Sequence, residues 1–323
     1  MINCTIVPPP GRPKTPDYTT ATAVDPTIFT SSRFLKDVES FCSILNAPFS
    51  SSTTQAVLRA YSTCINTGAL GWRVTTKDST LNYRLFQNKS ADTIAIAIKA
   101  NFIKPSPLTD LVQSWTMCFD GEVQQWCDFD TLKGLVKTWV FLGQTRNMED
   151  VLDVHFVPNS IRRHAGEFRR CGLDRVRTLA VDWHSKTVNI YWRVPGPLTQ
   201  TQADVLLGLA GCQPMGQAEV EEISRFSSAK DGSFAFAVTL GFESGEIERA
   251  GFYATKLSRG NLPGISDRLK IFLEKAPDYD PEEWITIAWG FGKDGRKYMK
   301  AEKSYCGRFV GKVKDMMTQD PNI

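Results

Sequence analysis

Five stretches of this 323-residue chain are each predicted to form two β-strands joined by a turn or a longer connection. The clearest lies at 176–193, where the second arm alternates between an apolar and a polar face as a strand requires: Val188, Ile190 and Trp192 against Asn189, Tyr191 and Arg193. The other four span 69–87, 114–143, 232–257 and 283–304. In the second of the five, residues 120–134 are predicted to connect arms at 114–120 and 135–143. Strands in this number restrict the chain to a sheet-based architecture, open or closed.

Segments with the periodicity of amphipathic helices lie before, between and after these hairpins: 31–45, 54–67, 90–101, 106–112, 158–171, 200–223, 263–275 and about 305–317. An open sheet would show its polar face to water, but helices between all the hairpins favour closure of the sheet. We therefore predict an α+β fold: a closed, ten-stranded antiparallel β-barrel surrounded by α-helices and built from about five helix–strand–strand–helix units.

Composition and the start of the chain bear on domain organisation. Residues 1–27 contain a Pro-Pro-Pro run and few large apolar side chains, which predicts a flexible tail, and residues 28–323 are predicted to form a single domain. The hydrophobic content of 42% suffices for a sizeable core, yet no run approaches the roughly 18 residues of a membrane-spanning helix. The N-terminus has no apolar signal core. We therefore expect a cytoplasmic protein without a membrane partner.

Charge and metal-binding residue types argue against two further classes of function. The net charge is +3 without a block rich in lysine and arginine, which disfavours a nucleic-acid partner. The eight cysteines contain no C-x-x-C pair and the three histidines are dispersed. We therefore expect reduced thiols and no metal site.

A closed barrel of this size has an interior too wide to be filled by its own side chains, so its inward faces become the wall of a cavity. The polar faces of the hairpins carry isolated cations among polar and aromatic side chains: Asn82 and Arg84; Lys137 and Trp139; Asn189, Tyr191 and Arg193; Arg249 and Tyr253; Tyr298, Lys300, Glu302 and Ser304. In 233–242 the face opposite the large apolar side chains consists of small residues, including Ala235 and Ala237. Such a cavity suits a ligand with an anionic head and an apolar or aromatic body.

Six short motifs occur in order along the chain: MCFDGEV at 117–123, VKTWVF at 136–141, GLDRV at 172–176, TVNIYW at 187–192, SGEIER at 244–249 and YMKAEKSY at 298–305. In this order and spacing they resemble the soluble aromatic prenyltransferases of the ABBA type, the naphterpin and clorobiocin biosynthesis group, including its fungal members. The resemblance covers most of residues 31–318. It implies a ten-stranded antiparallel barrel with the active site in its lumen. It also implies Friedel–Crafts-like transfer of a prenyl group from a prenyl diphosphate to an electron-rich aromatic ring.

The resemblance also implies roles for particular residues. The diphosphate would be held by Arg84, Lys137, Asn189, Tyr191, Arg249 and Lys300, with Arg73 and Lys186 as further members. Fixed cations and hydroxyls would stabilise the negative charge left when the allylic C–O bond ionises. The allylic cation would be shielded by the π faces of Trp139, Tyr191, Tyr253 and Trp289. The acceptor pocket would be lined by Val74, Ala235, Ala237 and Ser304, where the two alanines make it larger and less polar than in relatives with serine and tyrosine on this hairpin.

One departure from the family concerns metal ions. Some bacterial relatives bind magnesium through an aspartate in the first hairpin, where this chain has Arg84, and the D-D-x-x-D box of terpene enzymes is absent. A guanidinium can neutralise diphosphate directly, which predicts magnesium-independent turnover. We expect no metal and no cofactor, a prenyl diphosphate such as dimethylallyl diphosphate as co-substrate, and a phenolic or hydroxynaphthalene-like acceptor. The enzyme is expected to act as a monomer on these small molecules.

Several alternatives stay open from the residues alone. A non-catalytic barrel that binds an anionic amphiphile needs the same cationic lumen. Lys186 lies in a predicted turn and Arg73 is out of phase with its neighbours, so a solvated surface position is an equal alternative for both. For Trp139 and Trp289 the alternative is an ordinary position in the apolar core. Glu302 lies on the same strand face as Lys300, so its carboxylate can neutralise the charge of Lys300.

Overall fold

The computed structural model describes residues 25–87, 91–119, 123–229 and 232–317. Its ten strands close into one antiparallel barrel in the order β1-β10-β9-β8-β7-β6-β5-β4-β3-β2, which confirms the predicted architecture. The strands are β1 (Ala69–Thr75), β2 (Leu81–Phe86), β3 (Gln124–Asp130), β4 (Gly134–Asn147), β5 (Arg175–Asp182), β6 (Thr187–Val194), β7 (Phe234–Gly241), β8 (Ile247–Leu257), β9 (Ile285–Gly292) and β10 (Lys297–Cys306). Each pairs with its neighbours in the chain, and β1 pairs with β10 to complete the ring.

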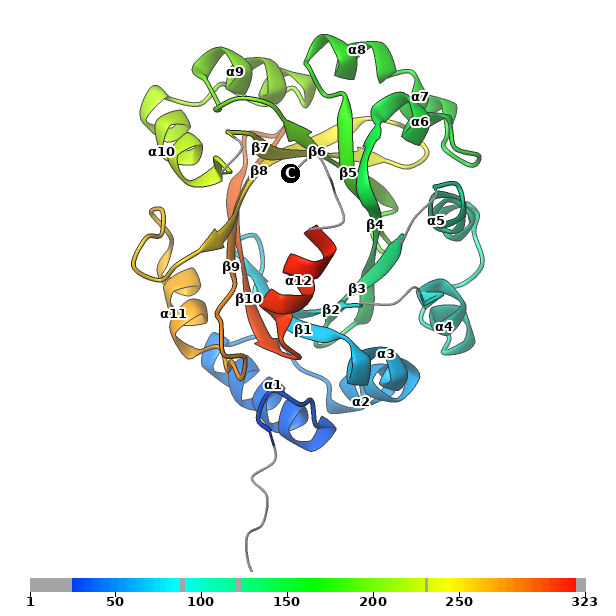
Figure 1. Ribbon diagram of the computed structural model, residues 1–323, viewed down its shortest axis with the longest axis vertical. Coiled ribbons are helices and arrows are strands. Elements are labelled where there is room, and N and C mark those ends of the chain that lie inside the picture. Colours follow the sequence, from blue (N-terminus) through cyan, green and yellow to red (C-terminus); the bar gives the residue numbers. More distant parts are fainter. Residues whose placement is uncertain (1–24, 88–90, 120–122, 230–231, 318–323) are drawn as a thin grey trace, which may run out of the picture.

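Helices surround the barrel, and the last described helix lies within the ring of strands when the molecule is viewed down the barrel (Figure 1). They are α1 (Ser31–Leu45), α2 (Ser51–Ala60), α3 (Ser62–Thr67), α4 (Thr93–Lys99), α5 (Pro107–Met117), α6 (Met148–Asp153), α7 (Asn159–Arg162), α8 (Ala165–Arg170), α9 (Gln200–Leu209), α10 (Gln217–Ser227), α11 (Asp267–Lys275) and α12 (Phe309–Met317). None of the described helices is long and apolar enough to cross a membrane.

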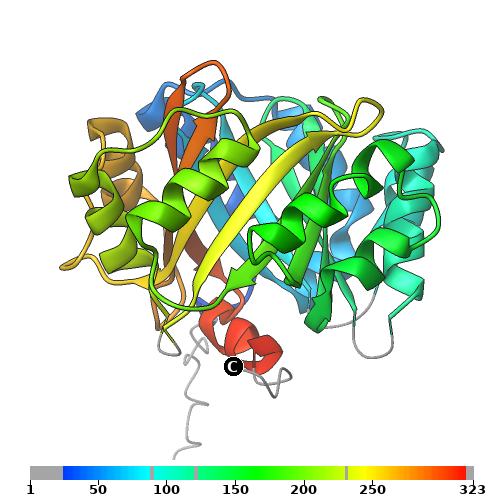
Figure 2. The same ribbon diagram turned by 90° about the horizontal axis from the view of Figure 1, so that it is seen from above.

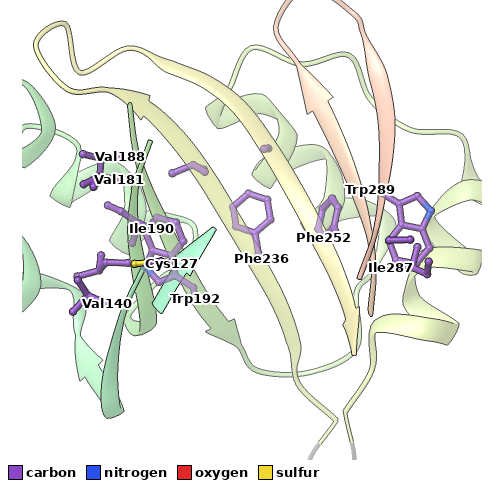
Figure 3. Packing of buried hydrophobic residues seen from close by; sticks show 14 of the residues in the cluster. Cys127, Val140, Val181, Val188, Ile190, Trp192, Phe236, Phe252, Ile287 and Trp289 are labelled. Carbon is purple, nitrogen blue, oxygen red and sulfur yellow. The ribbon is translucent and has the colours of Figure 1, made fainter. Parts of the chain in front are cut away.

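The outward faces of the strands and the helices above them share one apolar cluster. Val188, Ile190 and Trp192 of β6 are buried in it, as the alternation of this strand predicts (Figure 3). The ring of Trp192 meets that of Phe168 from α8 with their centroids 5.0 Å apart. Burying a large apolar side chain of this kind contributes about 1.5–3 kcal/mol to stability. Because neighbouring residues of a strand point to opposite faces, Asn189 and Tyr191 must face the interior.

One end of the barrel is closed by α12, which Figure 2 shows beyond the ends of the strands. Phe309, Val310 and Val313 of this helix are buried in a second apolar cluster made of inward-facing residues. The carboxylate of Asp280 accepts hydrogen bonds from the backbone amides of Arg308 and Phe309, each at 2.7 Å, and so satisfies free donors at the start of the helix. The hairpin turns lie at the opposite end of the barrel.

The prediction for the second hairpin was wrong in its first arm. Residues 107–117 form helix α5, and the partner of β4 is β3 at 124–130, within the stretch predicted to be a connection. Aspartate is uncommon in strands, and β3 carries Asp128 and Asp130. Asp128 is tolerated there because Arg84 on the neighbouring β2 and Arg73 on β1 neutralise it. An ion-pair partner on another strand cannot be predicted from the residues next to Asp128 in the sequence.

The predicted tail at 1–27 lies almost entirely outside the described residues, which begin at Asp25. Thr27 accepts a hydrogen bond from the backbone amide of Gly307 through its carbonyl oxygen, at 3.0 Å. The predicted helix at 200–223 is instead two helices, α9 and α10, separated by Gly211 in the left-handed region at a φ of 60°.

Candidate active site

The inside of the barrel is lined by polar, charged and aromatic side chains, in contrast to its apolar outer face. Tyr191, Tyr253, Arg249 and Lys300 face inward from three different strands and yet are only half-buried. Side chains enclosed by a closed sheet keep such exposure only where the sheet leaves open space beside them. The interior therefore has room that its own side chains do not fill.

Three cations on the interior wall form no ion pair within the described part of the chain. They are Lys137 of β4, Arg249 of β8 and Lys300 of β10, which we call the cation group. Among the described residues, no carboxylate oxygen lies within 4.0 Å of a side-chain nitrogen of any of them. A buried charge without a partner is costly. Residues kept in this state are candidates for binding an anionic ligand.

Asn189 lies beside the cation group and has an unused donor. The Thr239 hydroxyl donates to its Oδ1 at 2.8 Å, and Thr239 is paired in register with both Asn189 and Arg249. The Nδ2 of Asn189 and the Nε of Arg249 are buried without a hydrogen-bond partner. Since buried polar groups are nearly always satisfied, these two orphaned donors point to a missing acceptor.

The lysines of the cation group also show its uncompensated charge in their pKa values. Burial, followed by repulsion from Arg73, Lys137 and Arg249, lowers the pKa of Lys300 well below its usual value. Burial lowers the pKa of Lys137 to about 8, with Arg73 and Arg249 adding to the shift and Asp182 opposing it. Both shifts mean that this part of the interior favours an additional negative charge.

The titration of Lys137 gives a testable pH dependence. Above a pH of about 8 this lysine loses its proton, so the affinity for inorganic diphosphate is expected to fall as the pH rises through that value. The unfolded chain keeps the proton up to the ordinary lysine pKa of 10.5, so without ligand the free energy of unfolding should rise across the same window. Dissociation constants measured from pH 6.5 to 9.5 test this. A Lys137→Met variant serves as the reference, because subtracting its profile removes the titration of the ligand itself. Identical profiles in the two proteins would contradict the assignment.

Four other charged residues of the interior compensate one another. Arg84 Nε lies 2.5 Å from Asp128 Oδ1, and Arg84 Nη1 lies 2.8 Å from Glu302 Oε2. Arg73 Nη1 lies 2.6 Å from Asp128 Oδ2, with its Nε 3.6 Å from Glu302 Oε1. Burial raises the pKa of Asp128, but Arg84 and Arg73 outweigh it and lower that pKa to about 2. The two arginines are on the interior wall, as predicted, but their charges are balanced by two carboxylates. We call these residues the charge quartet.

Three aromatic rings adjoin both charged groups. The Trp139 ring centroid lies 4.2 Å from the guanidinium carbon of Arg84 and 5.4 Å from Lys137 Nζ. Its centroid is 4.9 Å from that of Tyr191, which is 5.4 Å from that of Tyr253. Burial and a hydrogen bond with Tyr253 hold the pKa of Tyr191 well above its usual value, so its hydroxyl stays protonated. The structure thus brings three of the four predicted shielding rings together as one aromatic wall.

The fourth predicted ring, Trp289, was placed wrongly. It lies in the outer apolar cluster, paired in register with Phe252 of β8, and Figure 3 shows it beside Ile287. The inward positions of β9 are taken by small residues such as Ala288. The prediction for Val74 was wrong for the same reason, since it shares the outer cluster with Trp72 two positions earlier.

Lys186 and Ser304 also lie outside the predicted roles. Lys186 is exposed in the turn between β5 and β6, with a φ of 51°. It is therefore not part of the wall itself, and its contact with the diphosphate stays a prediction. Ser304 is fully buried, donates from its hydroxyl to Asp278 at 2.8 Å and accepts from the backbone amide of Trp284 at 3.1 Å. Both hydrogen-bonding functions of that hydroxyl serve the segment before β9.

One wall of the interior has almost no side-chain volume. Ala237 and Gly251 are paired in register across β7 and β8, and Gly251 is in turn paired with Gly290 of β9. The predicted acceptor residues Ala235 and Ala237 both belong to this wall. A Cβ atom on Gly290 would lie 2.3 Å from the ring of Tyr298, so the glycine lets that ring lie directly against β9. The rings of Tyr298 and Tyr253 thus lie over Gly290 and Gly251, and the small side chains of Ala235 and Ala237 line the wall at β7.

Two residues that matter to this site could not be singled out from local patterns. Asp128 fell in the supposed connection. Lys77 lies in the turn between β1 and β2, where lysines are ordinarily solvated. Burial, then repulsion from Arg249 and Arg296, lowers the pKa of Lys77, which places it near the cation group at the hairpin-turn end. Its Nζ is 6.0 Å from the ring centroid of Tyr298, and Lys300 Nζ is 5.4 Å from the same centroid.

The interior carboxylates do not fit a magnesium site. Asp128 and Glu302 are both held by arginines, so a divalent cation would have to displace guanidinium groups to reach them. The described part of the chain contains no cluster of three or more histidine, cysteine, aspartate or glutamate side chains arranged to hold a metal ion.

Sequence comparisons place this interior in a known context. The family model described as "Aromatic prenyltransferase Orf2" matches residues 29–317. An aromatic prenyltransferase of Sclerotinia sclerotiorum is 41% identical over 296 residues, which cover 90% of this chain and 95% of that protein. The 4-hydroxyphenylpyruvate 3-dimethylallyltransferase of Streptomyces niveus is 34% identical over 284 residues, 87% of each chain.

Solved structures agree in fold. The 5-dimethylallyltryptophan synthase of Streptomyces coelicolor superposes with a TM-score of 0.56 at 13% identity, covering 86% of this chain and 97% of that one. The binary complex of PriB with product diphosphate gives a TM-score of 0.55 at 11% identity, with 86% and 96% covered. These likenesses support the barrel alone, whereas the family match and the sequence relatives extend over nearly the whole described chain. The chain therefore belongs to the Orf2 family of aromatic prenyltransferases, the ABBA-type enzymes that transfer prenyl groups.

Proposed function

We propose that this enzyme transfers a dimethylallyl group from dimethylallyl diphosphate to an electron-rich phenolic or hydroxynaphthalene-type ring, without a metal ion. The observation that supports this most is the cation group beside the aromatic wall. It combines three cations that form no ion pair, including Arg249 with its orphaned Nε, with the orphaned Nδ2 of Asn189, next to three π faces. A ligand that joins a multiply charged anion to a short apolar unit would place the anion at the cation group and the apolar unit at the aromatic wall.

The cation group would act on the leaving diphosphate. When the allylic C–O bond breaks, its electron pair leaves with the diphosphate, and negative charge grows on the oxygen atoms. Lys137, Arg249 and Lys300, with the free Nδ2 of Asn189, are already in place to receive it, so no reorganisation opposes the step. Each such preorganised donor contributes a factor of about 10²–10³ in rate.

The aromatic wall would act on the other fragment. The allylic cation is stabilised by the faces of Trp139, Tyr191 and Tyr253, which also keep water from it. The acceptor ring would enter along the small side chains of β7 at Ala235 and Ala237. Its π electrons form the new carbon–carbon bond to the allylic cation, and loss of the ring proton restores aromaticity.

Metal independence is supported by the charge quartet. Arg84 binds the two carboxylates that a metal would need. The positive charge that magnesium would bring is supplied by the cation group. The donor proposal is also supported by a relative named as a dimethylallyltransferase. The proposal includes one catalytic domain at 28–323 that acts as a cytoplasmic monomer, with prenyl diphosphate as co-substrate and no cofactor.

The experiment that tests this proposal is incubation of the purified full chain with dimethylallyl diphosphate and a panel of phenols and dihydroxynaphthalenes, with and without EDTA. We expect a prenylated product and released diphosphate at rates that EDTA leaves unchanged. Loss of turnover in EDTA that magnesium restores would contradict metal independence. Tight binding of diphosphate without product from any acceptor would favour the non-catalytic barrel instead.

A further inference from the structure

Beyond the aromatic wall, at the end of the barrel remote from the hairpin turns, lies a second group of rings. It consists of Phe86 from β2, Trp126 from β3, Phe141 from β4, Trp284 just before β9 and Phe309 from α12, and we call it the aromatic floor. All five side chains are buried and face the interior cluster rather than the outer core. None of them has a role in the transfer chemistry described above.

The rings of the floor touch one another around the helix that closes the barrel. The centroid of Phe309 lies 4.3 Å from that of Phe86 and 5.9 Å from that of Trp284. Phe86 continues to Trp126 at 4.9 Å, and Trp126 stacks on Phe141 at 5.3 Å. The floor is therefore a continuous row of rings, in which Phe309 of α12 joins Phe86 to Trp284.

Polar contacts hold α12 and hence the floor in place. Asp280 binds the first amides of the helix, and Lys312 Nζ donates to the carbonyl oxygens of Thr67 at 2.5 Å and Gly68 at 2.6 Å. Lys314 forms an ion pair with Glu282 at 2.8 Å. Contacts on both sides of the helix fix its ring against the barrel, so the floor is a rigid limit rather than a flexible one.

The distance between the cation group and the floor follows from β4, because this strand contributes one residue each to the cation group, the aromatic wall and the floor. Its inward positions are Lys137, Trp139 and Phe141, and a strand rises about 3.4 Å per residue, so Phe141 lies about 14 Å beyond Lys137. A diphosphate held at Lys137 puts the first allylic carbon beside Trp139. From there to the layer of Phe141 is about 7 Å along the strand. One isoprene unit spans about 5 Å at ordinary bond lengths, so one unit ends before the layer of Phe141 and a second would have to pass it.

We infer that the aromatic floor, which runs from Phe141 through Trp126 and Phe86 to Phe309, fixes the length of the prenyl chain that the enzyme accepts. This inference rests on the proposed function. The donor tail points from the cation group past Trp139 to the floor, and the acceptor uses the side of the interior at Ala235 and Ala237. A geranyl chain is one isoprene unit longer and meets the floor before its first carbon reaches the aromatic wall. The preference for a five-carbon donor follows from this contact.

The test compares geranyl with dimethylallyl diphosphate as the ratio of their kcat/KM values. The wild-type enzyme is expected to prefer dimethylallyl diphosphate, and Phe309→Ala is expected to raise the geranyl-to-dimethylallyl ratio by about tenfold or more. Phe309→Leu and Phe141→Leu should raise it by less. Both substrates are measured on one preparation, so the ratio does not depend on the fraction of folded protein.

Phe272→Ala is the matched control, because it removes a fully buried ring of α11 in the outer cluster. It should lower stability without changing the ratio. Dissociation constants of the unreactive geranyl and dimethylallyl S-thiolodiphosphates give the same ratio independently of turnover. An unchanged ratio in the folded leucine variants, by rate and by binding, would overturn the inference. Absence of product with either donor in the wild-type enzyme would instead refute the proposed function, and the binding ratio would still decide the role of the floor.

Discussion

Replacement of Lys300 by alanine is expected to lower kcat/KM for the prenyl diphosphate by about two to three orders of magnitude, the usual cost of removing one preorganised donor. The ammonium group faces the interior among the other cations, where the leaving diphosphate must gather its charge. Bulk water cannot replace it, because a water molecule carries no charge and has to reorient. Steady-state kinetics at several donor concentrations measures the loss.

The same replacement is expected to leave the fold at least as stable as the wild type. Burial and repulsion from Arg73, Lys137 and Arg249 lower the pKa of Lys300, so the folded protein disfavours its charged form. Removing the ammonium group also removes the unfavourable free energy of burying its charge in the folded protein. The free energy of unfolding in urea should therefore stay unchanged or rise, which is the trade between stability and activity common at active sites.

Lys297→Ala is the control on the same strand. Lys297 is exposed and pairs with Glu219 of α10 on the surface at 2.6 Å. Its loss should change neither turnover nor donor binding. Wild-type activity in Lys300→Ala, or an equal loss in Lys297→Ala, would show that the diphosphate does not bind at the cation group.

The period-2 pattern predicted which residues face the interior wherever one face of a strand was marked by polar side chains. Asn189 and Tyr191 alternate with Ile190 and Trp192, and the structure separates them to opposite sides of the barrel. The pattern failed in β9, whose sequence ITIAWGFG has no polar side chain on its inward face beyond Thr286. Trp289 was assigned by its presumed role, although it is in phase with Ile287 and Phe291.

The ion pairs of the interior could not be predicted from the sequence for a different reason. Arg84 and Asp128 are 44 residues apart and become neighbours only through the register of β2 and β3. Glu302 joins them from β10 because the barrel closes beside β1. A local pattern could identify Arg84 as inward-facing. Only the closed sheet shows that its charge is already balanced and that Lys137, Arg249 and Lys300 are the cations left without partners.

Because Asp128 balances the charge of two buried arginines, its replacement is the second change for which we expect a large effect, here on stability. Replacing it with asparagine keeps the shape of the side chain but leaves Arg73 and Arg84 with Glu302 as their one remaining anion in the charge quartet. Removing one partner of a buried ion pair costs about 3–5 kcal/mol, so we expect a loss of this size in the free energy of unfolding at pH 7. Urea denaturation followed by tryptophan fluorescence measures it. Glu246→Gln, which breaks the exposed pair with Lys293, should have no measurable effect.

The pH dependence separates a charge effect from a packing effect at Asp128. Its pKa is about 2 in the folded protein against an ordinary value of 3.8, so its stabilising contribution is fully present above pH 4 and is lost as the pH falls toward 2. The gap in stability between the wild type and Asp128→Asn should therefore narrow over that range. A gap that stays constant would mean that shape rather than charge is responsible.

Diphosphate should also stabilise the two proteins unequally. In Asp128→Asn the interior carries one more uncompensated positive charge, so added inorganic diphosphate should bind more tightly and raise Tm by more than it does in the wild type. If the diphosphate site is the cation group, Lys300→Ala combined with Asp128→Asn should remove most of that extra shift. An extra shift that survives in the double variant would place the anion at Arg73 and Arg84 instead, so this comparison decides which of the two charged groups holds the diphosphate.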